Sequence, residues 1–134
     1  MKAVFAGAAL FVCALGCVPG IAGAQSCGSL AASVDDARKL LLRAANEPAF
    51  GAAKNRALRA KNALDDAAVS SMDCQCKGAY SEFDTAALRA RRARDADSPN
   101  EYIESLEAAI RAFNSAIGEL KSCAAQRARQ GDFN

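Results

Sequence analysis

Four cysteines in the chain are spaced in a way that is compatible with two different chemistries. Cys27 precedes Cys74 by 47 positions, and Cys76 precedes Cys123 by the same 47. Thiols one residue apart, as at Cys74 and Cys76, could bind a soft metal such as Cu(I) or zinc, with Cys27 and Cys123 completing a four-sulfur set. The same pair could instead exchange disulfides with other proteins. The third interpretation is two structural disulfides, which require neither a metal nor a client.

The start of the chain favours disulfides because it predicts export. Lys2 precedes an apolar run from Ala3 to Val18, and Ala22-Gly23-Ala24 offers a small-residue cleavage site before Gln25. The run is shorter than the roughly 20 residues that span a bilayer. We therefore predict a signal peptide over residues 1–24 and a periplasmic or secreted protein, in a compartment where disulfides persist. A lipidated Cys17 is the minor alternative, because the preceding residues match a lipidation box only loosely.

The positions of the chain breakers favour one cysteine pairing. Four cysteines allow three pairings. In an antiparallel helical hairpin, two residues bridged at the open end are equally far from the turn. The midpoint of Cys27 and Cys74 falls at residues 50–51, just after Asn46-Glu47-Pro48, and that of Cys76 and Cys123 falls at residues 99–100. The spacing therefore predicts Cys27 with Cys74 and Cys76 with Cys123. The crossed alternative fits almost as well, since Cys74 and Cys76 are near neighbours.

Apolar residues at helical spacing predict four helices to carry these cysteines. The pattern is strongest after Ser98, where apolar positions recur every three or four residues. They are Leu106, Ile110, Phe113, Ile117, Leu120 and Ala124. Ser98-Pro99-Asn100-Glu101 is a capping box at the start of this helix. Weaker stripes follow Ser29, Phe50 and Cys76, and Ser81 could cap the third helix.

No stretch alternates with the period of a β-strand, so the sequence predicts an all-α fold. The expected architecture is a four-helix up-down bundle made of two disulfide-bridged antiparallel helical hairpins. The bundle domain would span residues 25–131, with one hairpin at 27–74, the other at 76–123, and a loose C-terminal tail at 132–134.

The composition predicts a core that buries little area. From Gln25 onward, 26 residues are alanine, which favours helix but has little apolar surface to bury. In the chain-entropy model, a disulfide that closes a loop of nearly fifty residues contributes about 4 kcal/mol. That is comparable to the net stability of a marginal domain, so the cysteines have a sufficient structural purpose.

Charge gives one local signal, the run Arg89, Arg91, Arg92 and Arg94. Without Lys2, 16 basic residues stand against 15 acidic ones, so the domain is nearly neutral. The arginines could contact an anionic partner or, together with the tail at 126–133, a membrane surface. We expect no nucleic acid, because the chain is predicted to be exported and aromatic residues do not interleave with the arginines. A solvated helix face is the simpler interpretation.

The residue content argues against an enzyme. The chain contains no histidine, which is the commonest general base and the usual activator of serine and cysteine nucleophiles. Phosphate-binding loops and nucleophile elbows are also absent from the sequence. We therefore expect no catalytic residues, no cofactor and no metal, and a non-catalytic role in binding another macromolecule or in the structure of the cell envelope. The partner and the oligomeric state are not specified by the sequence.

Overall fold

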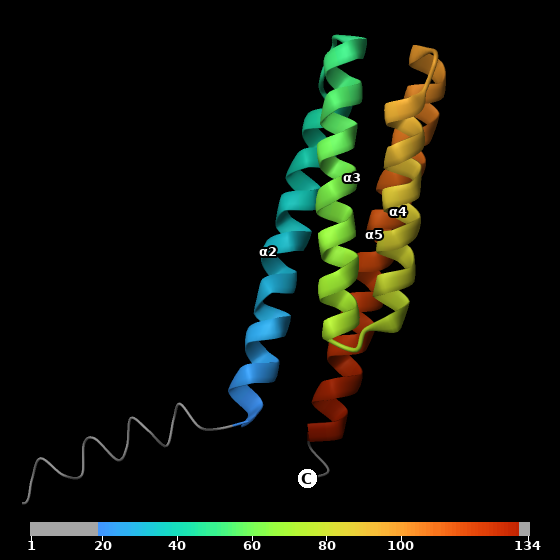
Figure 1. Cartoon of the computed structure of the whole chain (residues 1–134). Coiled ribbons are helices and arrows are strands. Elements are labelled where there is room, and N and C mark those ends of the chain that lie inside the picture. The colour runs from blue at the N-terminus through green and yellow to red at the C-terminus, as the bar shows by residue number, and fades with distance from the viewer. Residues whose placement is uncertain (1–18, 132–134) are drawn as a thin grey trace, which may run out of the picture.

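The structure is a computed structural model that describes residues 19–131, with side chains from residue 27 onward. Four helices follow one another and reverse direction at each connection (Figure 1): α2 (Pro19–Ala45), α3 (Phe50–Asp73), α4 (Lys77–Asp95) and α5 (Pro99–Gly131). No strand occurs in this part of the chain. The predicted all-α bundle of two bridged hairpins is confirmed, with disulfides Cys27–Cys74 and Cys76–Cys123. The predicted signal peptide lies mostly, and the tail at 132–134 entirely, outside the described residues.

Two helix starts differ from the sequence prediction. α2 spans Pro19–Ala45 in the described chain and so extends well ahead of Ser29, where the apolar stripe of the sequence begins. The predicted cleavage site before Gln25 therefore falls within α2, and the cleavage stays a prediction. α4 begins at Lys77, directly after Cys76, so Ser81 lies inside the helix and does not cap it.

The capping box at the start of α5 is present in a modified form. The Glu101 amide donates a hydrogen bond to Ser98 Oγ at 3.3 Å, as predicted. The Glu101 carboxylate accepts from the Asp97 amide at 3.0 Å and not from Ser98. The carboxylate thus satisfies a backbone donor one residue outside the standard box, and the helix start is fixed by two reciprocal contacts.

Alanine dominates the interior of the two central helices. The largest fully buried side chains there are Leu64 on α3 and Phe83 on α4. The remaining buried positions of these helices are mostly Ala53, Ala57, Ala60, Ala63, Ala67 and Ala68 on α3, and Ala79, Ala86, Ala87, Ala90 and Ala93 on α4. Small side chains let helix backbones approach closely, so α3 and α4 pack tightly while burying little side-chain area.

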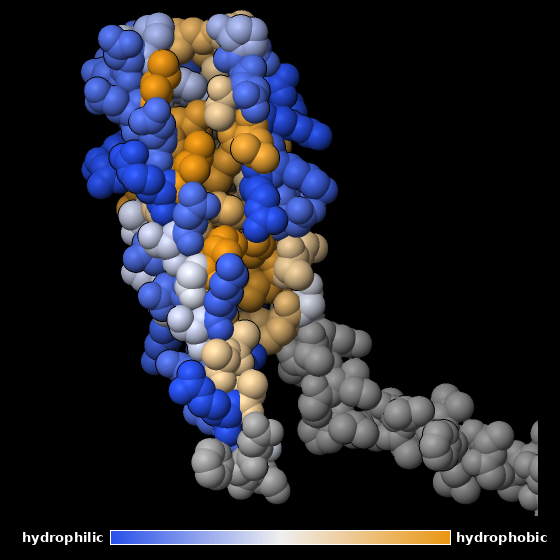
Figure 2. Space-filling view, turned by 180° about the vertical axis from the view of Figure 1, so that it is seen from behind, coloured by the Kyte–Doolittle hydropathy of each residue, from blue (hydrophilic) through white to orange (hydrophobic). Residues whose placement is uncertain are grey.

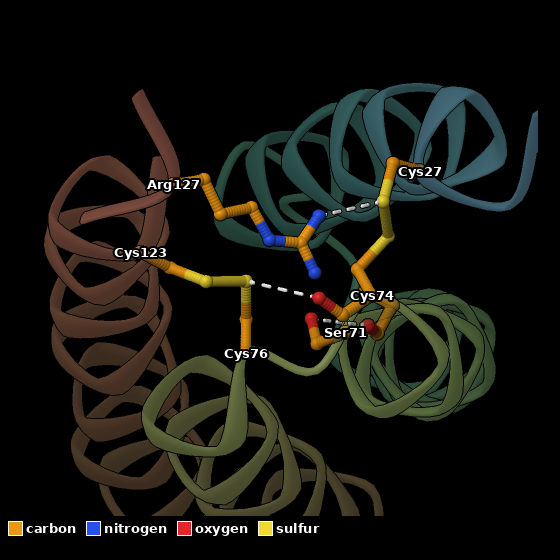
Figure 3. The surroundings of a disulfide bond; sticks show 7 residues. Cys27, Ser71, Cys74, Cys76, Cys123 and Arg127 are labelled. Atoms are coloured by element: carbon orange, nitrogen blue, oxygen red, sulfur yellow. Dashed lines mark hydrogen bonds between the residues drawn. A yellow bond between two sulfur atoms is a disulfide. The ribbon is translucent and has the colours of Figure 1, made fainter. Parts of the chain in front are cut away.

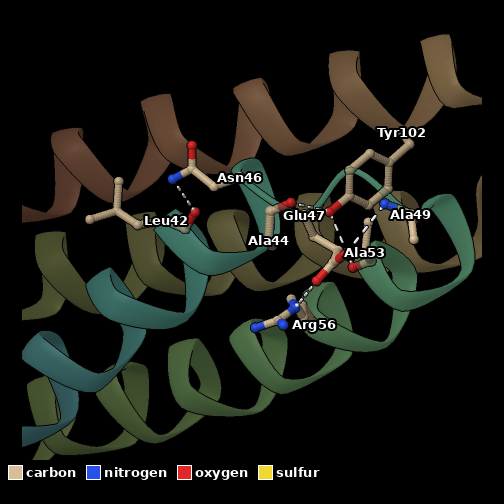
Figure 4. Close-up of polar contacts among 8 residues, drawn as sticks. All are labelled: Leu42, Ala44, Asn46, Glu47, Ala49, Ala53, Arg56 and Tyr102. Atoms are coloured by element: carbon tan, nitrogen blue, oxygen red, sulfur yellow. Dashed lines mark hydrogen bonds and ion pairs between the residues drawn. The ribbon is translucent and has the colours of Figure 1, made fainter.

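Polar contacts tie the two hairpins together at the end that carries the α2–α3 and α4–α5 turns, which we call the turn end (Figure 4). The buried Tyr102 hydroxyl lies 2.9 Å from the Ala44 carbonyl and 3.1 Å from the Ala53 carbonyl, so α5 is bonded to the first hairpin. Lys54 Nζ donates to the Ala96 carbonyl at 2.8 Å. Its positive charge thereby sits at the C-terminus of α4, where the helix dipole favours a cation.

The four helices do not close into a ring of equal contacts. α2 packs along α3, α3 along α4, and α4 along α5, whereas α2 and α5 approach each other closely at few positions. The bundle is therefore open along one side, between its first and last helices.

Candidate functional site

The four cysteines meet at the end of the bundle opposite the turns, which we call the clasp end (Figure 3). The Cα atoms of Cys27 and Cys74 are 5.4 Å apart, and those of Cys76 and Cys123 are 5.8 Å apart. Both separations are typical of disulfides. Each disulfide joins the two helices of one hairpin, so α2 is bonded to α3 and α4 to α5. The disulfides indicate an oxidising compartment.

Gln75 connects the two disulfide-bonded cysteines of the central helices in an unusual backbone conformation. Its φ angle is 59°, in the left-handed region, which costs a residue with a side chain roughly 1–2 kcal/mol. Its amide donates to the Met72 carbonyl at 2.9 Å, and that of Cys76 donates to the Ser71 carbonyl at 2.9 Å. The two hydrogen bonds close the end of α3, so the chain turns into α4 within the three residues 74–76.

The metal alternative requires thiols that the disulfide-bonded structure does not contain. Cu(I) and zinc bind thiolates, and the sulfurs of Cys27, Cys74, Cys76 and Cys123 are all bonded to one another in pairs. Within residues 19–131, three or more histidine, cysteine or acidic side chains nowhere gather into a metal-binding group. A four-sulfur metal site would exist only in the reduced protein, whereas disulfide exchange with other proteins stays a prediction, because a client thiolate can attack a disulfide directly.

The basic run lies on α4 near the turn end and is partly neutralised. Arg94 forms a bidentate contact with Asp95, with Nε–Oδ1 at 2.7 Å and a second bond at 3.0 Å, and Arg91 Nε lies 3.9 Å from Asp95. The hydrogen bond from Arg94 holds the pKa of the Asp95 carboxyl below its ordinary value. Arg89 and Arg92 are exposed. The run does not form a single cationic patch, because Asp95 lies among its arginines.

A groove between α2 and α5 is the most distinct surface feature of the described chain. Figure 2 shows the face of the molecule that is turned away from the viewer in Figure 1. On this face an apolar stripe runs along the long axis between two hydrophilic flanks. Two cavities lie along it, one of about 300 Å³ at the clasp end and one of about 290 Å³ near the middle. We call them the clasp cavity and the middle cavity. Together they make the open side of the bundle a groove with two recesses.

The clasp cavity is apolar apart from one guanidinium group. Its walls include Leu30, Ala31 and Val34 from α2, and Leu120, Ala124 and Arg127 from α5. The disulfide-bonded Cys27, Cys74 and Cys76 complete the lining. Arg127 extends from α5 across the open end toward α2, between the two disulfides (Figure 3), and its Nη1 lies 3.2 Å from Cys27 Sγ. Within residues 19–131, no carboxylate pairs with this guanidinium.

The middle cavity repeats this combination of apolar walls with a cation. Leu41 and Leu42 line it from α2, and Ile110 and Phe113 from α5. The Arg38 guanidinium lies 5.8 Å from the centre of the Phe113 ring, a cation–π distance. Leu42 is 54% exposed, so the cavity opens to solvent.

The sequence contains a partial signal for this groove and none for the position of Arg127. Leu106, Phe113 and Leu120 recur every seven residues, and so do Ile103, Ile110 and Ile117, each three residues before a member of the first series. A stripe of this width is broader than the two-position seam of a coiled coil. The periodicity marks the stripe, but it does not specify which neighbouring helix leaves part of it open.

Comparison of the chain with models of protein families, with curated protein sequences and with solved structures finds no match. In the described part of the chain, every helix is too short or too polar to cross a membrane. The class of protein that the structure defines is thus a disulfide-bridged, open four-helix bundle with an apolar groove.

Proposed function

We propose that this protein is an exported, non-catalytic binding protein that holds its partner or ligand in the groove between α2 and α5. Export is supported by the sequence of residues 1–24, which has the features of a secretory signal. Two disulfides support a destination in the periplasm or outside the cell. The non-catalytic role is supported by a composition without histidine.

The observation that carries the proposal is the open, apolar side of the bundle. A bundle whose only purpose were structural would be expected to bury such a stripe by closing α2 on α5, because apolar burial is the main favourable term in folding. Here the groove keeps two recesses near 300 Å³, at the lower end of the size range of ligand sites. Exposed apolar surface of this kind marks binding sites in soluble proteins.

The test compares two substitutions of matched chemistry, one inside the groove and one outside it. Leu42→Glu places a charge in the middle cavity, whereas Val69→Glu places one on α3 at a site that is 60% exposed and lies outside the lining of both groove cavities. The wild type and both variants are exported by the source cell and purified under native conditions. Bound molecules are then identified by native mass spectrometry, which detects proteins and small ligands alike.

We expect a defined molecule to accompany the wild type and Val69→Glu, and to be lost from Leu42→Glu. Helix content by circular dichroism shows that both variants remain folded. If the same molecules accompany all three proteins, or if none does, the groove is not the binding site and the proposal is wrong. The intact mass tests export in the same sample, because it should begin at Gln25 and lack the four hydrogens removed by two disulfides.

A further inference from the structure

We infer that the clasp cavity binds a single-chain anionic amphiphile, such as a fatty acid, with the chain in the cavity and the anionic head on Arg127. The inference rests on the proposed function and names the ligand class. The walls of the clasp cavity are apolar, whereas its mouth carries a positive charge. The walls are aliphatic side chains and disulfide sulfurs, and the one ionised group in the lining is the Arg127 guanidinium.

The hydrogen-bond donors of the Arg127 guanidinium have only a weak acceptor in the described chain. Arg127 carries five N–H donors, and the partner found for it is Cys27 Sγ at 3.2 Å, a weak acceptor. No carboxylate in residues 19–131 forms an ion pair with it. A carboxylate ligand would accept two parallel hydrogen bonds from the guanidinium fork. Because Arg127 is exposed, this head would stay at the solvent boundary while the chain goes inward.

The groove gives the hydrocarbon chain a direction. The middle cavity continues the apolar path beyond the clasp cavity. Val34 lines the clasp cavity and Leu41 lines the middle cavity, and the two residues are about 10 Å apart along α2. A chain that starts at Arg127 therefore reaches from one recess toward the next. Each methylene buried in an apolar site should tighten binding roughly fourfold. Affinity should thus rise from octanoate to decanoate to laurate.

A helix from a partner protein or from a second copy fits these observations less well. A helix with its side chains is about 10 Å across, whereas each recess holds about 300 Å³, the volume of a small ligand. Such a helix would lie over the groove and insert single side chains. An extended hydrocarbon chain can fill the recesses themselves, and it needs the single charge that Arg127 supplies.

The probes are monomeric laurate, dodecanol and dodecyltrimethylammonium, which share a chain and differ in the charge of the head. Isothermal titration uses the exported, disulfide-bonded protein, and each probe stays below its critical micelle concentration. We expect one laurate per protein, with dodecyltrimethylammonium at least about tenfold weaker because the cationic head repels Arg127. Arg127→Gln should weaken laurate about tenfold through the lost charge-assisted bonds and leave dodecanol unchanged. Arg129→Gln, on the same helix but outside the cavity lining, should change neither.

A second pair of variants tests the cavity independently of the charge. Ala124 is exposed and lines the clasp cavity, whereas Ala125 is exposed and lines none of the described cavities. Ala124→Phe should fill the recess and abolish laurate binding, and Ala125→Phe should not affect it. Circular dichroism shows that each variant keeps its helices. Anionic vesicles of phosphatidylglycerol form a further arm, which distinguishes uptake of free acyl chains from uptake out of a bilayer.

The inference is overturned if laurate does not bind the wild type, if Arg127→Gln and Arg129→Gln weaken it equally, or if Ala124→Phe still binds it. It is also overturned if the protein associates with vesicles but not with monomeric laurate. A groove-dependent protein partner found by native mass spectrometry, together with absent laurate binding, would refute the amphiphile and leave the proposed function standing.

Discussion

Removing one disulfide at a time tests how a core made largely of alanine is stabilised. The two disulfides have the same sequence separation of 47 residues, and their loops follow each other without overlapping. In the chain-entropy model each loop stabilises the fold by about 4 kcal/mol, by restricting the unfolded chain. The double variants Cys27→Ala with Cys74→Ala, and Cys76→Ala with Cys123→Ala, should therefore lose equal free energies of unfolding.

The structure makes these two variants controls for each other. Cys74 is 2% exposed and Cys76 is 7% exposed, and Cys27 and Cys123 are both partly buried, so each variant removes similar contacts. Removing both disulfides should cost about 8 kcal/mol, which exceeds the stability of many domains. We expect each double variant to fold and the protein without cysteines to be largely unfolded.

Urea unfolding followed by circular dichroism measures both quantities. Opening a loop lets the unfolded chain expand, so the urea dependence of the unfolding free energy should become steeper in each double variant. A loss below about 1 kcal/mol for either pair, or a loss more than about twice as large for one pair as for the other, would refute the loop-closure account. The stabilisation would then come from contacts in the folded state.

Three further predictions concern single positions. Tyr102→Phe should cost about 1–2 kcal/mol, because buried carbonyls lose their donor, as urea unfolding would show. Burial, and after it the negative charge of Glu47, raises the pKa of the Tyr102 hydroxyl, so the folded state favours the neutral phenol. The stability that Tyr102 contributes is therefore fully present below the pKa of about 10 of an unfolded tyrosine. It is lost as the pH rises through the higher pKa of the folded state. This alkaline loss should be absent from Tyr102→Phe. Gln75→Gly should stabilise the fold by up to about 1 kcal/mol, because glycine adopts positive φ without strain, and an unchanged urea midpoint would contradict this. Ala90→Leu should cost at least about 1–3 kcal/mol by overpacking, whereas Ala125→Leu on the exposed face of α5 should have little effect on thermal unfolding.

The sequence predicted the elements that rest on local chemistry. Leu106, Ile110 and Phe113 recur at helical spacing, and the Ser98 hydroxyl caps the helix that carries them. The equal cysteine separations and the breakers between them predicted which helices pair. These features depend on residues close in sequence, or on distances counted along the chain, and so a single sequence contains them.

The remaining features depend on which helices become neighbours, and a periodic stripe does not contain that information. Tyr102 follows the capping box that predicted the last helix, but its bonds to the Ala44 and Ala53 carbonyls cross 58 and 49 positions of the chain. Arg127 belongs to a stretch that the sequence assigned only to helix or membrane contact. Its position at the mouth of a cavity follows from the approach of α5 to the first disulfide, which is a property of the assembled bundle.

The open groove has a physical origin in how side-chain size is distributed among the helices. Alanine on α3 and α4 brings the central helices close to their neighbours, while leucine, isoleucine and phenylalanine on α2 and α5 occupy more space than a tight pair of helices leaves. The covalent links reinforce the difference. Turns and disulfides join α2 to α3 and α4 to α5, and residues 74–76 join α3 to α4. In the described chain no covalent link crosses from α2 to α5, so this interface can widen to admit a ligand without breaking either disulfide.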